Sequence, residues 1–354
     1  MTPNPPDAPA ALPSAPPDVA DDRGAPRFGT YAGELGRVEL GRLSGRFQPP
    51  VPLRPLRRKR WHYAFVATNE VALACAVVDL GYAANAFVVA LDLGAERPIV
   101  DLSMLGLPGL LARVNDRPAE GAEARFRTRG ARLSIERAEG SRAYRLRGAI
   151  GSTGSSPSLH WDVELSTDRR GPALTVVAPV DGGRVNVTQK HAGLGARGLL
   201  VAGARTYRLD RGVGGLDYTQ GYLAYRTAWR WAFACGRLED GTPFGFNLVE
   251  GFNAAAGVSE NALWLGDRMT PLGPARFRFR RDALLEPWQL ATDDGALDLH
   301  FRPLWVHREA RDLKVIESRF AQPLGLFEGR ARAFGRALTL RALPGVTEDQ
   351  AMRW

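Results

Sequence analysis

The residues with the clearest potential for chemistry surround a lone carboxylate, Asp217, which follows the glycine-rich stretch Gly212–Gly215. Glycine allows backbone conformations that other residues avoid, so a functional group beside it can be held in an unusual position. In a dry pocket, burial would favour the neutral acid, which could then act as a general acid. The side chains that we predict to line a ligand pocket around it are Tyr218, Tyr222, Tyr225, Arg226, Trp229 and Trp231. The alternative interpretation is that Asp217 caps a tight turn and that the tyrosines pack in a core.

Two more carboxylates, Glu250 and Glu260, lie on either side of a predicted hairpin loop, and the amides of Asn253 and Asn261 follow them closely. A simple turn does not need this density of polar groups. We therefore predict Glu250 and Glu260 as catalytic residues beside Asp217, and the two asparagines as ligand-binding residues. Asx-turns at Asn253 and Asn261 are the alternative explanation.

The C-terminal segment 345–354 carries two adjacent acids, Glu348 and Asp349, and ends on a tryptophan. Chain ends normally fray, so this composition predicts a docked segment. We assign Glu348 and Asp349 to the ligand-binding residues, and docking for stability alone is the alternative.

Several common chemistries have no signature in this sequence. The chain contains no Gly-x-x-x-x-Gly-Lys phosphate loop, no His-Glu-x-x-His motif and no Gly-x-Ser-x-Gly motif. None of its histidines lies within four residues of another, so we predict no metal site and no cofactor. The pattern around His300 and His307 favours histidines on the surface of a strand.

The composition is that of an ordinary globular protein, with 45% hydrophobic and 24% charged residues. No window approaches about 18 uninterrupted apolar residues, so we predict no transmembrane segment. The N-terminus lacks the basic and then apolar layout of a signal peptide, and we therefore expect a cytoplasmic protein. Cys75 and Cys235 lie in apolar, strand-like runs and are predicted to be buried free thiols.

The net charge of +9 could indicate a nucleic-acid partner, but the distribution of charge argues against one. All but three of the 47 basic residues are arginines, and most are scattered among acids, which is typical of codon bias. Only the run Arg54–Arg60 is concentrated enough to contact phosphates. We expect no nucleic-acid partner, while peripheral contact with a membrane and the oligomeric state stay open.

The hydrophobic pattern predicts strands almost everywhere after Trp61. Residues 159–165 alternate apolar and polar side chains, as in a half-buried strand. Hairpins are predicted over 71–93, 133–147, 198–209 and 229–248, each with a turn that contains glycine. The most plausible helix is a short one over 102–114.

Strands at this spacing predict antiparallel barrels or sandwiches, and they extend over more residues than one small barrel holds. We therefore predict an all-β protein with two β-domains, residues 46–210 and 211–354. Residues 1–45 are predicted to be a disordered or irregular tail. Within it, residues 1–26 have almost no large apolar side chains to offset the entropy of ordering.

Short motifs in a fixed order resemble an uncharacterised bacterial family known as domain of unknown function 2804. They are Arg54-Pro-Leu-Arg, Arg60-Trp-His-Tyr, Val78-Asp-Leu-Gly-Tyr, Asp217-Tyr-Thr-Gln-Gly-Tyr, Trp229-Arg-Trp-Ala, Gly251-Phe-Asn, Glu260-Asn and Gly345-Val-Thr-Glu-Asp. In that family a His commonly follows the last two acids. Gln350 stands there in this chain, so the resemblance implies no acid–base role for that position.

More distantly, residues 198–221 resemble the motif of the hydroxyneurosporene synthase and AttH-like group. In that group glycines lead to an Asp with a Gly four residues on, as Asp217 and Gly221 do here, although Gln220 replaces the usual Trp. The group has two lipocalin-like β-barrels and includes an isoprenoid hydratase. The resemblance therefore implies two calycin-like or lipocalin-like barrels and a pocket for a hydrophobic small molecule.

Three functions fit these observations. The first is a cofactor-independent hydratase or cyclase for an isoprenoid or other lipid-like substrate in the mouth of the second barrel, with Asp217 as the acid and aromatic faces around it. The second is a non-catalytic binding protein for a hydrophobic small molecule. The third is a scaffold whose polar groups only cap turns.

Overall fold

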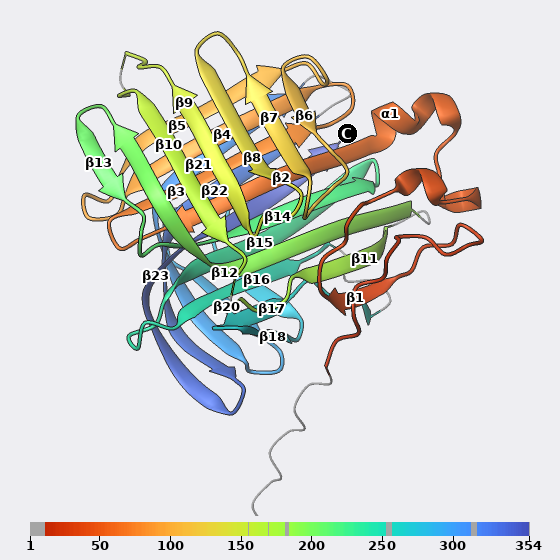
Figure 1. Ribbon diagram of the computed structural model, residues 1–354. Coiled ribbons are helices and arrows are strands. Elements are labelled where there is room, and N and C mark those ends of the chain that lie inside the picture. Colours follow the sequence, from red (N-terminus) through yellow and green to blue (C-terminus); the bar gives the residue numbers. More distant parts are fainter. Residues whose placement is uncertain are drawn as a thin grey trace, which may run out of the picture.

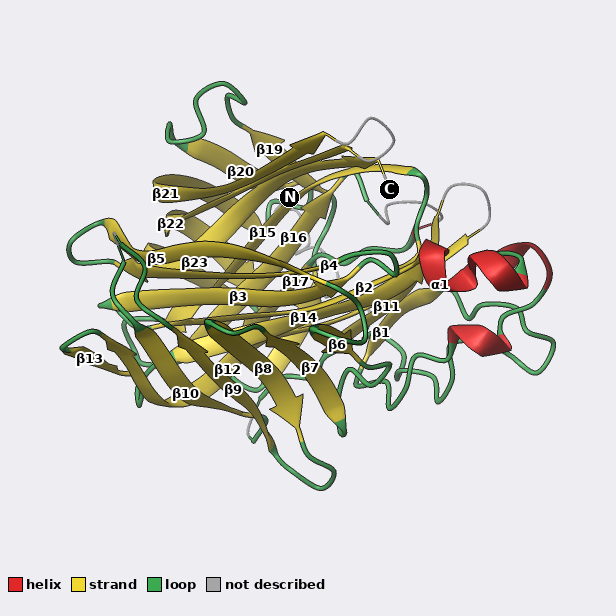
Figure 2. Cartoon of the chain, turned by 90° about the horizontal axis from the view of Figure 1, so that it is seen from above, coloured by secondary structure: helices red, strands yellow, loops and turns green. Residues whose placement is uncertain are grey.

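The structure, a computed structural model, describes residues 11–154, 156–168, 170–180, 184–252, 257–312 and 317–353. It is 63% strand and 4% helix, which confirms the all-β prediction. Two curled antiparallel sheets stack on each other, and the short helices lie together at one end (Figures 1 and 2).

The first sheet is nearly closed into a barrel. Its main path in the described part of the chain is β5 (Arg97–Gly106), β4 (Ala84–Asp92), β3 (Val71–Asp79), β2 (Arg58–Ala67), β14 (Val213–Tyr222), β12 (Arg184–Ala202), β10 (Leu159–Ser166), β9 (Ala143–Ile150), β8 (Ala131–Arg137), β7 (Ala122–Arg127) and β6 (Ala112–Val114). Beside this path, β1 (Gly29–Ala32) pairs with β11 (Leu174–Val180), and both β11 and β13 (Arg205–Arg208) pair with β12. Contacts of β6 with β3 and β4 bring one end of the path next to strands near its other end.

The second sheet is a half-barrel. In pairing order it contains β18 (Arg268–Pro271), β17 (Ala262–Leu265), β16 (Pro243–Glu250), β15 (Arg226–Arg237), β23 (Arg336–Arg353), β22 (Glu317–Ala333), β21 (Leu297–Asp312), β20 (Trp288–Thr292) and β19 (Ala275–Arg278). Four short helical turns precede β2: η1 (Leu40–Arg42), η2 (Gly45–Phe47), η3 (Val51–Leu53) and α1 (Arg54–Arg57). In the described part of the chain, every helix is too short or too polar to span a membrane.

Strand alternation divides the buried side chains among three cores. The first core fills the inside of the first barrel and includes Trp161 and Tyr218. The middle core lies between the two sheets and includes Phe65 and Phe233. The second core fills the curve of the half-barrel, around residues such as Phe301. Because successive side chains point to opposite faces, strands such as β14 and β15 are buried on both sides.

The glycines before Asp217 lie within or just before β14 rather than in a turn. A Cβ atom on Gly215 would overlap the ring of Phe233 in the other sheet, and one on Gly214 would crowd the carbonyl of Phe65. These glycines therefore serve close packing of strands and sheets, not an unusual backbone conformation.

The predicted hairpins are confirmed, with β3–β4, β8–β9, β12–β13 and β15–β16 as their strands. The predicted helix over 102–114 is wrong. Residues 97–106 pair with β4 as β5, because an open sheet edge outweighs the weak local preference for a helix. The chain passes from the first sheet to the second between Tyr222 and Arg226, one strand later than the predicted division at 210, and the division into domains stays a prediction.

The N-terminal segment from residue 11 onward packs against the first sheet. Val19, Leu35 and Leu43 are buried in the first core, and β1 adds a strand beside β11. The low apolar content of residues 11–26 therefore does not prevent packing, because a few well-placed side chains are buried. Residues 1–10 lie outside the described residues. Both cysteines are buried free thiols, as predicted.

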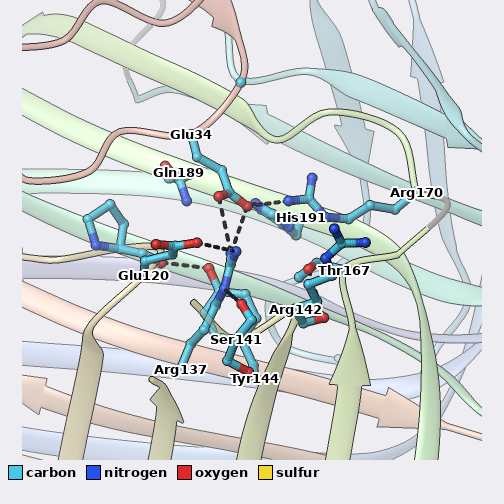
Figure 3. Close-up of polar contacts among 12 residues, drawn as sticks. Glu34, Glu120, Arg137, Ser141, Arg142, Tyr144, Thr167, Arg170, Gln189 and His191 are labelled. Atoms are coloured by element: carbon cyan, nitrogen blue, oxygen red, sulfur yellow. Dashed lines mark hydrogen bonds and ion pairs between the residues drawn. The ribbon is translucent and has the colours of Figure 1, made fainter. Parts of the chain in front are cut away.

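A buried polar cluster ties this segment to the inside of the first barrel (Figure 3). Glu34 accepts a hydrogen bond from Nη1 of Arg137 at 3.0 Å and forms an ion pair with Arg170. Its Oε1 also lies 3.4 Å from Nε2 of His191. Burial lowers the pKa of His191, and the nearby arginines lower it further, so this imidazole is neutral.

Candidate functional site

A cavity of about 420 Å³ lies between the two sheets, at the end of the molecule where β3 turns into β4. One wall residue, Leu105, is 59% exposed and lies at the opening. The walls are mainly apolar, and their large side chains are Trp61, Tyr63, Tyr82, Phe87, Trp229, Trp231, Phe252 and Phe320. The cavity thus lies between the sheets, and not in the mouth of the second barrel where the sequence places the ligand.

Three charged side chains form a buried cluster in the cavity wall. Nζ of Lys190 lies 2.6 Å from Oδ2 of Asp217 and 3.2 Å from Oε2 of Glu260. Strand pairing places Lys190 of β12 opposite Asp217 of β14, so the first contact follows from register. Burial alone would lower the pKa of Lys190, but attraction to the two carboxylates outweighs it and raises this pKa.

Asp217 also accepts hydrogen bonds from the hydroxyl groups of Thr188 and Thr219, both at 3.3 Å. It is therefore a paired carboxylate in the middle of a strand. This environment differs from both expectations, the turn cap and the isolated acid, because an ammonium group lies within hydrogen-bonding distance.

Glu348 on β23 has the environment of a buried acid. Its Oε1 accepts a hydrogen bond from the Trp229 indole at 2.7 Å, and its Oε2 accepts one from the Gln322 amide at 3.2 Å. Burial raises the pKa of Glu348 to about 7, because these neutral donors do not replace its lost hydration. A carboxyl group that is near half-protonated at neutral pH can both donate and accept a proton.

Aromatic rings surround this carboxyl group. Trp61 and Trp229 are stacked with their centroids 6.1 Å apart, and Phe252 lies 5.0 Å from Trp229. Tyr63 meets Trp231 edge to face at 5.1 Å. Ring faces of this kind attract positive charge, most strongly where water is excluded.

A second polar network reaches the cavity through Glu309 on β21. Glu309 accepts hydrogen bonds from Asn85 and Ser103, both at 2.6 Å. Behind it, Nδ1 of His307 lies 2.5 Å from Oδ1 of Asp101, and Nε2 lies 3.4 Å from Glu309. Burial would lower the pKa of His307, but these two carboxylates raise it to about 9. His307 is therefore a buried, charged bridge, and its assignment to a strand surface is wrong.

Four polar atoms in the cavity wall have no hydrogen-bond partner among the described residues. They are the hydroxyls of Tyr63 and Tyr82, Oδ1 of Asn85 and Oε1 of Gln322. A buried polar atom without a partner costs about 1–3 kcal/mol, so we expect bound water or a ligand to satisfy these atoms. In the described ranges, no three His, Cys, Asp or Glu side chains are arranged to hold a metal ion.

The cavity brings together five of the predicted site residues, which are Asp217, Glu260, Trp229, Trp231 and Glu348. Because successive side chains of a strand point to opposite faces, other predicted site residues face away from the cavity. Tyr218 and Tyr222 point into the first barrel, opposite to Asp217. Asp349 likewise points away from Glu348 and pairs with Arg281 at 3.0 Å.

The remaining predicted residues lie outside the cavity wall. Glu250 pairs with Arg230 at 2.7 Å, and Asn261 bonds to the backbone of Val249 and Gly273. Tyr225 and Arg226 are exposed. Asn253 lies outside the described residues.

Four residues of the cavity wall that could bind a ligand or transfer a proton were not predicted as site residues from the sequence: Tyr63, Asn85, Lys190 and Glu309. Tyr63 had a signal, because Trp61 and Tyr63 are two residues apart and so share one face of a strand. Lys190 also had one, as one of only three lysines in an arginine-rich chain. Glu309 had none.

The fold and the cavity define a two-sheet β-protein with a mainly apolar pocket between its sheets. The profile of the family described as Domain of unknown function (DUF2804) matches residues 13–354, so the chain belongs to this family, as its motifs predict. No curated protein sequence matches the chain.

Several solved structures are similar to this one. CghA with Sch210972 has a TM-score of 0.50 and 10% identity, over 98% of this chain and 95% of that one. Kievitone hydratase from Nectria haematococca has a TM-score of 0.47 and 11% identity, over 84% and 88%. An AttH-like protein from Nitrosomonas europaea has a TM-score of 0.47 and 12% identity, over 83% and 92%. At these identities the similarity concerns the fold.

Proposed function

We propose that this protein is an enzyme that protonates a carbon–carbon double bond of a lipid-like substrate and so hydrates or cyclises it. The observation that carries the proposal is a buried carboxyl group, Glu348, with a pKa of about 7 in a mainly apolar cavity lined with aromatic rings. A proton donor works best when its pKa lies near the working pH.

The proton of Glu348 would go to one carbon of the double bond. The two π electrons form the new C–H bond and leave positive charge on the other carbon, facing Trp61, Trp229 or Trp231. In hydration, water adds to that carbon and returns a proton to the carboxylate, so the net change is the addition of one water molecule. In cyclisation, a second double bond attacks the cation, and a later loss of a proton restores Glu348.

The Lys190 cluster would stabilise this charge without moving a proton. The carboxylates of Asp217 and Glu260 together with one ammonium group carry a net negative charge beside the cavity. A fixed negative charge favours a developing cation more strongly where water is excluded. We therefore propose Asp217 as a charge stabiliser and Glu348 as the acid.

The alternative function is a binding protein for a hydrophobic small molecule. The unpartnered polar atoms of Tyr63, Asn85 and Gln322 favour it, because a few polar groups in an apolar pocket fix the orientation of a ligand. CghA, which has a similar fold, has been crystallised with Sch210972, so a protein of this fold can be crystallised with a small molecule.

Turnover in heavy-oxygen water separates the two functions. Farnesol and oleic acid serve as substrates, and mass spectrometry detects labelled oxygen in the product. We expect label with the wild type and a loss of roughly a hundredfold or more with Glu348→Gln, which keeps shape but not the acidic proton. The fluorescent probe N-phenyl-1-naphthylamine should bind both proteins equally. Probe binding that farnesol displaces, with neither a labelled product nor an unlabelled cyclised isomer from either protein, would support the binding protein instead.

A further inference from the structure

Exposed apolar side chains gather around the opening of the cavity. Among the described residues, the exposed large hydrophobic side chains at this end of the molecule include Val51, Leu53, Leu56, Leu105, Leu107 and Leu110. Val51 and Leu110 are 68% and 74% exposed. Exposed apolar side chains that gather at one end of a protein can mark an interaction site.

Hydrogen bonds, close packing and strand pairing place these segments next to the cavity. Nζ of Lys59 donates to the carbonyls of Leu56 and Leu80, both at 2.7 Å, and Leu80 lines the cavity. Close packing of Gly81 against the carbonyl of Pro55 joins the same two segments. Leu105 lies opposite Asn85 in the pairing of β4 with β5, so the segment 105–110 continues the same edge. In Figures 1 and 2 the helical segment with α1 projects beyond the strands at this end.

Five arginines without carboxylate partners accompany this apolar surface. Arg46, Arg57 and Arg184 line a second pocket of about 200 Å³, and Arg54 and Arg58 lie on the same segment as Arg57. In the described part of the chain none of the five is in an ion pair. Many arginines elsewhere are paired, so positive charge is concentrated and uncompensated here.

We propose that this end of the molecule docks on an anionic lipid bilayer. Val51, Leu53 and Leu56 would insert among the lipids, and the pocket of Arg46, Arg57 and Arg184 would take a lipid phosphate. Apolar side chains next to clustered basic ones are the combination that binds anionic membranes, because burial of the apolar groups adds to attraction by the headgroups. The cavity would then open toward the bilayer, so that a lipid-like molecule could enter it without crossing water. Membrane docking does not depend on whether the cavity catalyses a reaction.

Vesicle sedimentation tests this proposal. The wild type should sediment with vesicles of phosphatidylcholine and phosphatidylserine, far less with phosphatidylcholine alone, and less at high salt. The triple variant R46Q/R57Q/R184Q should bind about a hundredfold more weakly, since each basic residue at an anionic surface contributes roughly fivefold. The control R208Q/R336Q/R341Q removes the same charge from distant strands and should sediment like the wild type.

A matched pair of single variants tests the apolar side chains. Leu53 and Leu199 are 40% and 41% exposed, but Leu199 lies at the far end of β12. Leu53→Glu should lose most vesicle binding, Leu199→Glu should keep it, and both should retain the wild-type melting temperature. Equal loss in both charge variants or in both leucine variants would overturn the proposal. A wild-type protein that does not sediment with the anionic vesicles would also overturn the proposal, and so would one that instead forms a dimer in solution through this surface.

Discussion

Replacing Glu348 with Gln should make the protein more stable at neutral and alkaline pH. The pKa of Glu348 is raised from 4.5 to about 7 by burial, so the folded state holds the proton more tightly than the unfolded state does. The stability that the folded state gains from this tighter proton binding is fully present below about pH 4.5, and it is lost as the pH rises through about 7. The difference in pKa corresponds to about 3 kcal/mol, since one pKa unit is about 1.4 kcal/mol. The amide of Gln resembles the protonated acid and does not titrate.

Urea denaturation from about pH 5 to about pH 8 measures this effect. Glu348→Gln and the wild type should differ little at the acidic end, and the variant should be more stable by up to about 3 kcal/mol at the alkaline end. The control Glu328→Gln changes an exposed carboxylate on the neighbouring strand β22 and should show no such trend. A constant difference between Glu348→Gln and the wild type across this range would refute the assignment of Glu348 as a buried acid.

Three further predictions concern the packing and charge around the cavity. Lys190→Met removes the ammonium group that pairs with two buried carboxylates, and it should lower the free energy of unfolding by about 3–5 kcal/mol. A loss below about 1 kcal/mol in denaturant titrations would contradict a buried ion cluster. Gly215→Ala should destabilise by about 1–3 kcal/mol because its Cβ meets the facing sheet, while Gly195→Ala, which has open space, should be neutral in thermal melts. In NMR titrations, the His307 ring should stay charged at neutral pH and deprotonate near pH 9. His62 should stay neutral at neutral pH, because burial lowers its pKa to about 3. A pKa of His62 above that of His307 would contradict the two environments.

The sequence by itself determined the local structure of this protein. The alternation in Trp229–Cys235 and the Glu-Asp-Gly turn after it specify a hairpin, because side chains on a strand point alternately to opposite faces. The motifs were also enough to identify the family. The same alternation could have separated Asp217 from Tyr218, since neighbours on a strand cannot face one cavity.

Only the tertiary structure decided which groups meet. The ion pair of Lys190 with Asp217 depends on the register of β12 against β14, and the contact of Trp229 with Glu348 depends on β15 lying beside β23. Glu260 joins Lys190 from the segment that leads into β17 of the other sheet. Register and the stacking of sheets are set by packing between segments that are distant along the chain, and a single sequence carries no local signal for them.

The same reason explains why we propose Glu348, and not Asp217, as the acid. Both are buried carboxyl groups on strands, and neither sequence context indicates which of them has a cation beside it. An ammonium group lies 2.6 Å from one, and only neutral donors bond to the other. Whether a buried carboxyl group holds its proton depends on these neighbours in space, so the acid of the site is defined by the fold and not by the residue type.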